Sequence, residues 1–215
     1  MEEAVILESV SKKIKNKTIL NNISLEFRKG RVYGIKGRNG SGKTMLLRVI
    51  CGLLRPDSGK VIIQGEDITE GSTLPEDTGV IIETPGFIDH YSGFRNLKIL
   101  AAIRNVISDE QIIETMKLLE LDPYNNQKVK TYSLGMRQRL GIVQAIMENP
   151  ELIILDEPTN ALDDNCVKIV HETIKSLKEK GKIIIIASHN AEDINILCDE
   201  VFEMDNGNIK KIDSF

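Results

Sequence analysis

The sequence contains no tryptophan, and phenylalanine and tyrosine amount to only 4% of its 215 residues. A hydrophobic core therefore has to be built from isoleucine, leucine and valine. Cysteine is also scarce: Cys51, Cys166 and Cys198 are odd in number, widely separated and without the spacing of a metal site. Such cysteines are typical of reduced cytosolic thiols, and they give no sign of a disulfide framework.

Long hydrophobic runs and an excess of positive charge are missing as well. No apolar run is longer than residues 183–187, whereas a helix that crosses a bilayer needs ~20 apolar residues. The opening MEEAVILESV has acidic residues where a secretory leader has basic ones. The net charge of −4 does not suggest nucleic acid. We therefore expect no nucleic-acid partner, and any work at a membrane requires another chain to provide the membrane part.

Strand and helix patterns alternate over most of the chain. Residues 1–30 predict two strands joined by a basic turn. Buried strand patterns at residues 152–156 and 182–188 alternate with amphipathic helices, which indicates a mainly parallel sheet covered on both faces. The helix pattern KTMLLRVICGLL predicts one buried face with Leu46, Val49, Ile50 and Leu53.

One segment departs from this alternation, because residues 86–149 show only helical patterns. We therefore predict a single α/β domain over residues 1–215. Within it, residues 1–85 and 150–215 form the core, with an N-terminal antiparallel β portion. Residues 86–149 form an inserted α-helical subdomain.

The stretch GRNGSGKT at residues 37–44 fits the phosphate-loop pattern G-x-x-x-x-G-K-[ST] and lies between a strand pattern and a helix pattern. Its glycines let the backbone curl until its N–H groups point at phosphate oxygens, and the helix dipole adds positive potential. Lys43 is expected to bridge the outer phosphates, and the Thr44 hydroxyl to bind Mg²⁺. The predicted phosphate-binding residues are Asn39, Gly40, Ser41, Gly42, Lys43, Thr44 and, through its backbone N–H, Met45.

Two acidic residues, Asp156 and Glu157, follow the apolar strand pattern LIIL. Charges at the end of such a strand are unfavourable unless a cation or a ligand meets them. Asp156 is expected to bind Mg²⁺ opposite Thr44, and Glu157 to polarise the water that attacks the γ-phosphate. His189 follows another strand pattern, at the edge where parallel sheets bind ligands, and is expected to contact the γ-phosphate. The alternative is a solvated strand end and a structural histidine.

A second predicted helix start, in TYSLGMRQRLG at residues 131–141, also suits an anion. Ser133 and Gly135 lie at this start, where a serine hydroxyl and backbone N–H groups are natural phosphate ligands. An N-cap by Ser133 is the other interpretation.

Together and in this order, the motifs resemble those of nucleotide-binding subunits of ATP-binding cassette (ABC) transporters, over essentially the whole chain. GRNGSGKT resembles the family's Walker A motif, LIILDEP its Walker B motif, and SLGMRQ its signature motif. NALD at residues 160–163 resembles the D-loop and adds Asp163 to the nucleotide-binding residues, and SH resembles the switch histidine. The resemblance implies a P-loop NTPase (RecA-like) core and a Mg²⁺-dependent ATPase with Glu157, His189 and Lys43 as catalytic residues.

In this family two cassettes pair head to tail around two ATP molecules. The resemblance therefore implies a second cassette as partner, with a homodimer as the simpler expectation. Ser133 and Gly135 would hold the γ-phosphate of the partner's ATP. The resemblance also implies a separately encoded membrane permease contacted by the helical subdomain. The chain would then be cytoplasmic and peripheral at the inner face of the cell membrane.

Glu83, in VIIETPGF, stands where the family usually has a glutamine that touches Mg²⁺ and the attacking water. We expect Glu83 to be a metal-proximal residue. Leu134 and Met136 also replace the usual signature glycine and glutamine. These departures resemble the cassettes that export peptide antibiotics such as bacitracin and lantibiotics, or confer immunity to them, which favours export.

Three other interpretations compete with a transport cassette. A soluble ABC-type ATPase of DNA repair or translation would need coiled coils or tandem cassettes. A GTPase would need the guanine-reading motif Asn-Lys-x-Asp, whereas NKTI lacks the aspartate and precedes the phosphate loop; a P-loop kinase leaves SLGMRQ unexplained. A non-catalytic regulatory cassette would not need Lys43, Asp156, Glu157 and His189.

Overall fold

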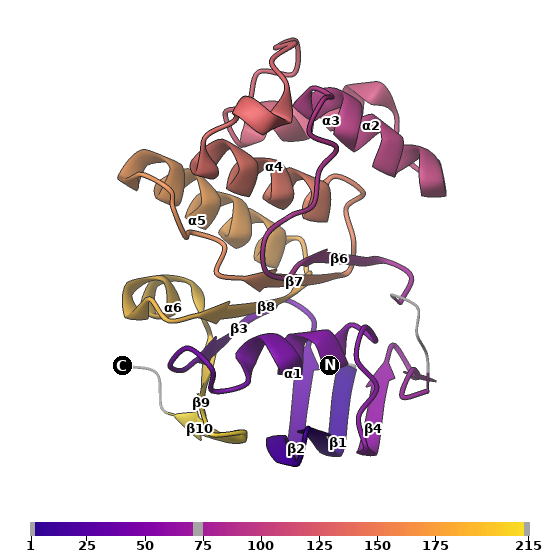
Figure 1. Cartoon of the computed structure of the whole chain (residues 1–215), viewed down its shortest axis with the longest axis vertical. Helices are drawn as coiled ribbons and strands as arrows, with labels where there is room; N and C mark the ends of the chain where they lie inside the picture. Colours follow the sequence, from indigo (N-terminus) through magenta and orange to yellow (C-terminus); the bar gives the residue numbers. More distant parts are fainter. Residues whose placement is uncertain (1–2, 71–74, 213–215) are drawn as a thin grey trace.

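The computed structural model describes residues 3–70 and 75–212, which form two β-sheets with helices packed around them (Figure 1). The smaller sheet is antiparallel, with the strand order β2-β1-β4-β5. A turn at Lys15 and Asn16, with φ of 46° and 65°, closes its first hairpin in the left-handed conformation that two-residue turns require. The sheet confirms the predicted antiparallel portion and consists of β1 (Glu3–Ile14), β2 (Lys17–Arg28), β4 (Ser58–Ile63) and β5 (Glu66–Asp67).

The larger sheet has six strands in the order β10-β9-β3-β8-β7-β6. All neighbours pair in parallel except β9 and β10, which form a hairpin. The carboxyl ends of β3, β8, β7 and β6 therefore lie along one edge, where α/β sheets bind ligands. The strands are β3 (Arg31–Lys36), β6 (Thr78–Ile81), β7 (Leu152–Asp156), β8 (Ile183–Ser188), β9 (Glu200–Asp205) and β10 (Asn208–Ile212).

Helix α1 (Lys43–Ile50) lies between the two sheets and contributes to the core that joins them. Leu46, Val49 and Ile50 are buried as predicted. The prediction was wrong for Leu53, which lies beyond the helix and is 55% exposed. Gly52 explains the early end, because its φ of 72° is the left-handed conformation that commonly terminates helices.

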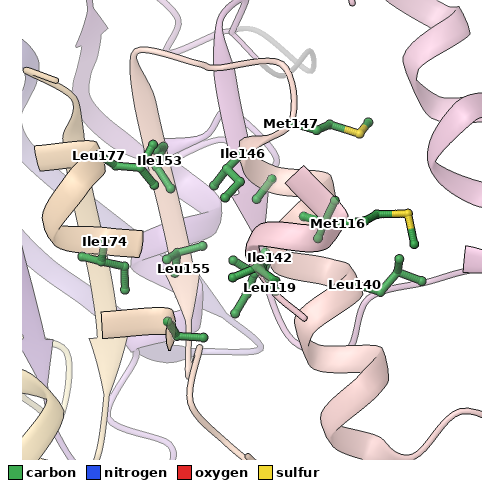
Figure 2. Packing of buried hydrophobic residues seen from close by; sticks show 14 of the residues in the cluster. Met116, Leu119, Leu140, Ile142, Ile146, Met147, Ile153, Leu155, Ile174 and Leu177 are labelled. Carbon is green, nitrogen blue, oxygen red and sulfur yellow. The ribbon is translucent and has the colours of Figure 1, made fainter. Parts of the chain in front are cut away.

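The central strands are buried on both faces, because successive side chains point to opposite sides. Ile154 of β7 belongs to the core shared with α1 and the smaller sheet, whereas Ile153 belongs to the core on the other face. Figure 2 shows this second face, with β7 between α4 (Leu134–Ile146) and α5 (Asp164–Glu179). Isoleucine, leucine and valine make up most of both cores, and Phe27, Tyr33 and Phe202 add a small aromatic cluster to the core shared with the smaller sheet.

The helical segment continues outward from α4. Helices α2 (Gly93–Arg104) and α3 (Asp109–Leu118) pack against α4, and α3 begins with a capping box formed by Ser108 and Gln111. A short 3₁₀ helix, η1 (Val129–Thr131), precedes α4. Helix α6 (Ala191–Leu197) follows β8. In the described part of the chain, no helix is both long and apolar enough to cross a membrane.

The contact between α4 and β6 is unusually close at Gly79. A Cβ atom added to Gly79 would collide with the carbonyl oxygen of Ala145, near the carboxyl end of α4. Backbone therefore lies directly against backbone at this point, which only glycine permits.

Candidate functional site

The carboxyl edge of the larger sheet borders a cavity of about 610 Å³. Its walls come from the loop after β3, the segments after β6 and β7, and the first turns of α4. The sequence-predicted residues that line the cavity are Asn39, Gly40, Gly42, Lys43, Thr44, Met45, Glu83, Asp156 and Glu157.

The phosphate loop curls as its glycines predict. Gly40 and Gly42 have φ of 80° and 114°, which other residues rarely adopt, and Gly42 is the N-cap of α1. Lys43 is only 6% exposed, and its Nζ donates to the Gly37 carbonyl at 2.7 Å. The loop thus wraps around a buried positive charge, an arrangement suited to phosphate oxygens.

Two oxygen ligands suited to a magnesium ion lie together on this loop and the neighbouring strand. The Thr44 hydroxyl donates to Asp156 Oδ2 at 2.7 Å, and Asp156 is 6% exposed. Burial raises the pKa of the Asp156 carboxyl, since nearby charge is too weak to offset the lost hydration, and Glu157 raises it further. A cation beside Asp156 would supply the missing compensation.

A buried polar atom in the loop also fits a bound nucleotide. Within the described residues, Ser41 Oγ is buried and has no hydrogen-bond partner. The described residues contain no group of three or more His, Cys, Asp or Glu side chains that could hold a metal by themselves. Mg²⁺ typically binds one or two carboxylates together with phosphates and waters.

Glu157 and His189 form a contact pair at the end of β7 and β8. His189 Nδ1 lies 2.8 Å from Glu157 Oε2, and the backbone N–H of His189 donates to Glu157 Oε1 at 3.1 Å. The Glu157 backbone has a φ of 51°, the left-handed region, which turns the chain sharply after the strand. Glu157 Oε1 is also 3.8 Å from Lys43 Nζ.

Glu83 lines the cavity, but its side chain turns toward α1. Glu83 Oε1 lies 2.9 Å from the guanidinium of Arg48, and the Glu83 side chain is 55% exposed. Its backbone N–H, by contrast, hydrogen-bonds to Asp156 and lowers the pKa of that carboxyl. No sequence pattern indicated a role for Arg48, which lies one helical turn beyond Thr44.

Ser133, Gly135 and Asp163 lie outside the lining of the cavity. Ser133 is the N-cap of α4 and accepts a hydrogen bond from the N–H of Met136 at 3.1 Å. Asp163 is likewise the N-cap of α5, and its hydrogen bond from Cys166 lowers the pKa of its carboxyl. Ser133 and Asp163 therefore have local capping roles here, and nucleotide contact remains a prediction for all three residues.

Several cavity residues were missed by the sequence analysis. All but Ile19 lie within stretches already quoted for the predicted site, beside the residues singled out there, but only folding shows that they line the cavity. They are Ile19, Arg38, Thr84, Pro85, Leu134, Arg137, Gln138, Asn160 and Ala161.

A family model described as ABC transporter matches residues 20–160. The chain belongs to the ABC transporter family. It is 46% identical over 202 residues to the uncharacterized ABC transporter ATP-binding protein YybJ of Bacillus subtilis (strain 168), covering 94% of this chain and 93% of YybJ.

Other relatives carry more specific names. The bacitracin transport ATP-binding protein BcrA of Enterococcus faecalis is 37% identical over 211 residues, with 97% of this chain and 68% of BcrA covered. The lantibiotic transport ATP-binding protein SrtF of Streptococcus pyogenes is 34% identical over 193 residues, with 90% and 83% covered. These matches confirm the resemblance to the bacitracin and lantibiotic cassettes.

A solved structure gives the same fold with product bound. The dimeric ATP-binding cassette MJ0796, in a post-hydrolysis state with ADP and Pi, superposes with a TM-score of 0.85 at 25% identity, covering 98% of this chain and all of MJ0796. The P-loop NTPase fold and an ATPase activity coupled to transport therefore hold for this ABC subunit.

Proposed function

We propose that this ABC subunit powers a separately encoded permease that exports peptide antibiotics or similar drug-like molecules. The names of BcrA and SrtF support this substrate class. The proposal places the chain at the inner face of the cell membrane, where residues 86–149 contact the permease and residues 1–85 and 150–215 bind nucleotide.

In the proposed reaction the phosphate loop binds and orients ATP. Lys43 exchanges the Gly37 carbonyl for the outer phosphates, and Ser41 Oγ gains a partner. Thr44, Asp156 and Glu83 would hold Mg²⁺, which supplies positive charge to the phosphates. Glu157 then accepts a proton from the attacking water, and general-base assistance of this kind contributes ~10²–10⁴ in rate.

His189 is placed to control that base. The backbone N–H of His189 donates a hydrogen bond to the Glu157 carboxylate, and Nδ1 of the His189 ring lies beside the same carboxylate. We infer that the ring turns to the γ-phosphate when ATP is present and leaves the carboxylate available to water.

The position of Ser133 is the observation that most supports the proposed pairing of two cassettes. Ser133 is exposed, caps the start of α4 and is not among the residues that line the cavity of its own chain. A helix start with a serine hydroxyl favours an anion, and a second copy of this chain would bring one in its ATP. Gly135 and Asp163 lie in the same pairing surface of this proposal. A homodimer with two equivalent sites is the simplest assembly.

Light scattering of Glu157→Gln with ATP and Mg²⁺ tests this proposal. The substitution removes the base and keeps the phosphate-loop contacts, so ATP should persist and hold two cassettes together. We expect a dimer with ATP and a monomer with ADP. Ser133→Arg in the same background should abolish the dimer, because the added charge and bulk obstruct the helix start.

A matched control separates this effect from general surface disturbance. Ser108 is also an exposed N-cap serine, on α3, so Ser108→Arg should leave the ATP-dependent dimer intact. A monomer in ATP, with ATP binding verified by a fluorescent nucleotide, would contradict the homodimer.

A further inference from the structure

We propose that Gln138 is a positioning residue that holds the backbone of Glu157 for hydrolysis. Through it, the helix start at Ser133 is coupled to the catalytic base of the same chain. This second part rests on the proposed pairing of two cassettes. Gln138 is the last residue of SLGMRQ and lies one turn into α4, but the sequence alone indicated no role for it.

The Gln138 side chain bridges two parts of the fold. Its Nε2 donates to the carbonyl oxygen of Glu157 at 3.0 Å and to that of Pro158 at 3.2 Å. A glutamine amide has two N–H donors, and both are engaged by these consecutive carbonyls. The side chain is partly buried, so each contact is only partly exposed to competing water.

The Glu157 backbone is a position that needs such support. Its φ of 51° is unfavourable for a residue with a side chain, and strain of this kind is on the order of 1–3 kcal/mol. The N–H of Glu157 donates to the Ala187 carbonyl at 2.8 Å, and its carbonyl also accepts from the N–H of Asn160 at 3.2 Å. The Gln138 side chain adds a further hydrogen bond to the Glu157 backbone, and it comes from outside the turn.

A second contact fixes the same helix end against the same turn. A Cβ atom added at Gly135 would lie 3.0 Å from the carbonyl oxygen of Ala161, so the first turn of α4 rests on that residue. Ala161 also has a left-handed backbone, with φ of 63°. Gly135 and Gln138 thus hold α4 at two points along residues 157–161.

These contacts connect the start of α4, which is proposed to bind the partner's ATP, with the turn that carries Glu157. The start of α4 faces outward, where the proposal places the phosphate of the partner's ATP. The turn that it holds carries the Glu157 carboxylate of its own site. A shift of α4 on binding that phosphate would therefore move the base, and misplacement by ~1 Å can lower a rate by 10²-fold.

The variant Gln138→Glu tests the positioning role directly. It keeps the side-chain shape, removes both N–H donors and sets a negative charge against two carbonyls. We expect kcat of ATP hydrolysis to fall by about tenfold or more, with KM for ATP within about twofold, because the phosphate loop is untouched. In the nucleotide-free protein, amide hydrogen exchange over residues 157–162 should become faster.

Gln144→Glu is the matched control, because it places the same change on the same helix at a residue outside the nucleotide cavity. It should leave kcat and the exchange of residues 157–162 unchanged. Gln138→Met adds no charge and also lacks the donors, so it should reproduce the loss of kcat if Gln138→Glu unfolds.

Either of two results would overturn the proposal: full kcat in a folded Gln138 variant, or unchanged exchange at residues 157–162. The coupling is measured separately, as the dependence of rate on ATP concentration, which should lose cooperativity in Gln138→Met. Wild-type hydrolysis and the Glu157→Gln dimer, measured alongside, show whether the pairing itself fails. If pairing fails while Gln138→Met still lowers kcat, the positioning role stands and the coupling is refuted.

Discussion

Glu83 shows at the scale of one residue how a charge changes the neighbourhood of a phosphate site. A glutamine there could both donate and accept, whereas the carboxylate only accepts and brings a negative charge. In the structure that charge is paired with Arg48 at 2.9 Å, and Arg48 is close to Thr44 along the same helix. Glu83 therefore has a counter-ion already, and Mg²⁺ must compete with it.

This competition predicts opposite effects for two substitutions. Glu83→Gln should raise the Mg²⁺ concentration for half-maximal ATP hydrolysis by about threefold, since an exposed charge pair is worth under ~1 kcal/mol. Arg48→Gln should lower that concentration, because Glu83 loses its competing partner. Titration of ATPase rate against free Mg²⁺ measures both. If Glu83→Gln and Glu83→Ala leave rate and Mg²⁺ dependence unchanged, Glu83 is not a metal-proximal residue.

At the scale of elements, a buried polar network joins α5, α6 and the turn after β7. Asp193 of α6 is 1% exposed and lies 2.8 Å from His171 Nε2 of α5. Its other carboxylate oxygen accepts a hydrogen bond from the Thr159 hydroxyl. Because α6 begins two residues after His189, the network joins the elements on both sides of the Glu157–His189 pair.

Removing the centre of this network should destabilise the fold strongly. Asp193→Ala leaves His171 and Thr159 buried without partners, and we expect the free energy of unfolding to fall by about 3 kcal/mol. The neighbouring Glu192→Ala should lower it by less than about 1 kcal/mol, because Glu192 is exposed. Urea denaturation of the two variants makes the comparison. Equal losses would show that the network adds no stability.

Prediction from the sequence succeeded for most of the strands and helices and failed for some of their ends and for contacts between them. The strands and the phosphate loop were predictable because their signals are local: apolar runs, capping residues and glycines at fixed spacing. Leu53 was misplaced because the helix pattern continued through Gly52, whose left-handed backbone ends the helix. Gln138 and Arg48 escaped notice because their partners come from other elements, and only folding brings them together.

At the scale of the whole molecule, the proposed pairing implies that each nucleotide site is incomplete in one chain. The cavity is lined by the phosphate loop, Asp156 and Glu157, whereas Ser133 is not among its lining residues. If pairing supplies the missing contacts, hydrolysis is a property of the dimer and depends on how much dimer is present.

This dependence gives a simple prediction for the wild-type subunit without permease. The ATPase rate per mole of chain should rise with protein concentration while dimers are scarce, and then level off, as mass action requires. Steady-state assays over about a hundredfold range of concentration would show the curve. A rate per chain that is constant across the range would mean that one chain suffices or that its partner is another protein.

The glycine contact beneath α4 has a mechanical consequence. Gly79 touches the helix near its carboxyl end, and Ser133 caps the other end, about 20 Å away for a helix of 13 residues. Because a helix is stiff, displacing its carboxyl end also changes the position of its amino end. The methyl group of Gly79→Ala would therefore tilt α4 and move the end that Ser133 caps. If Ser133 binds a phosphate as proposed, its affinity for that phosphate should therefore be sensitive to Gly79→Ala, although Gly79 does not contact the phosphate.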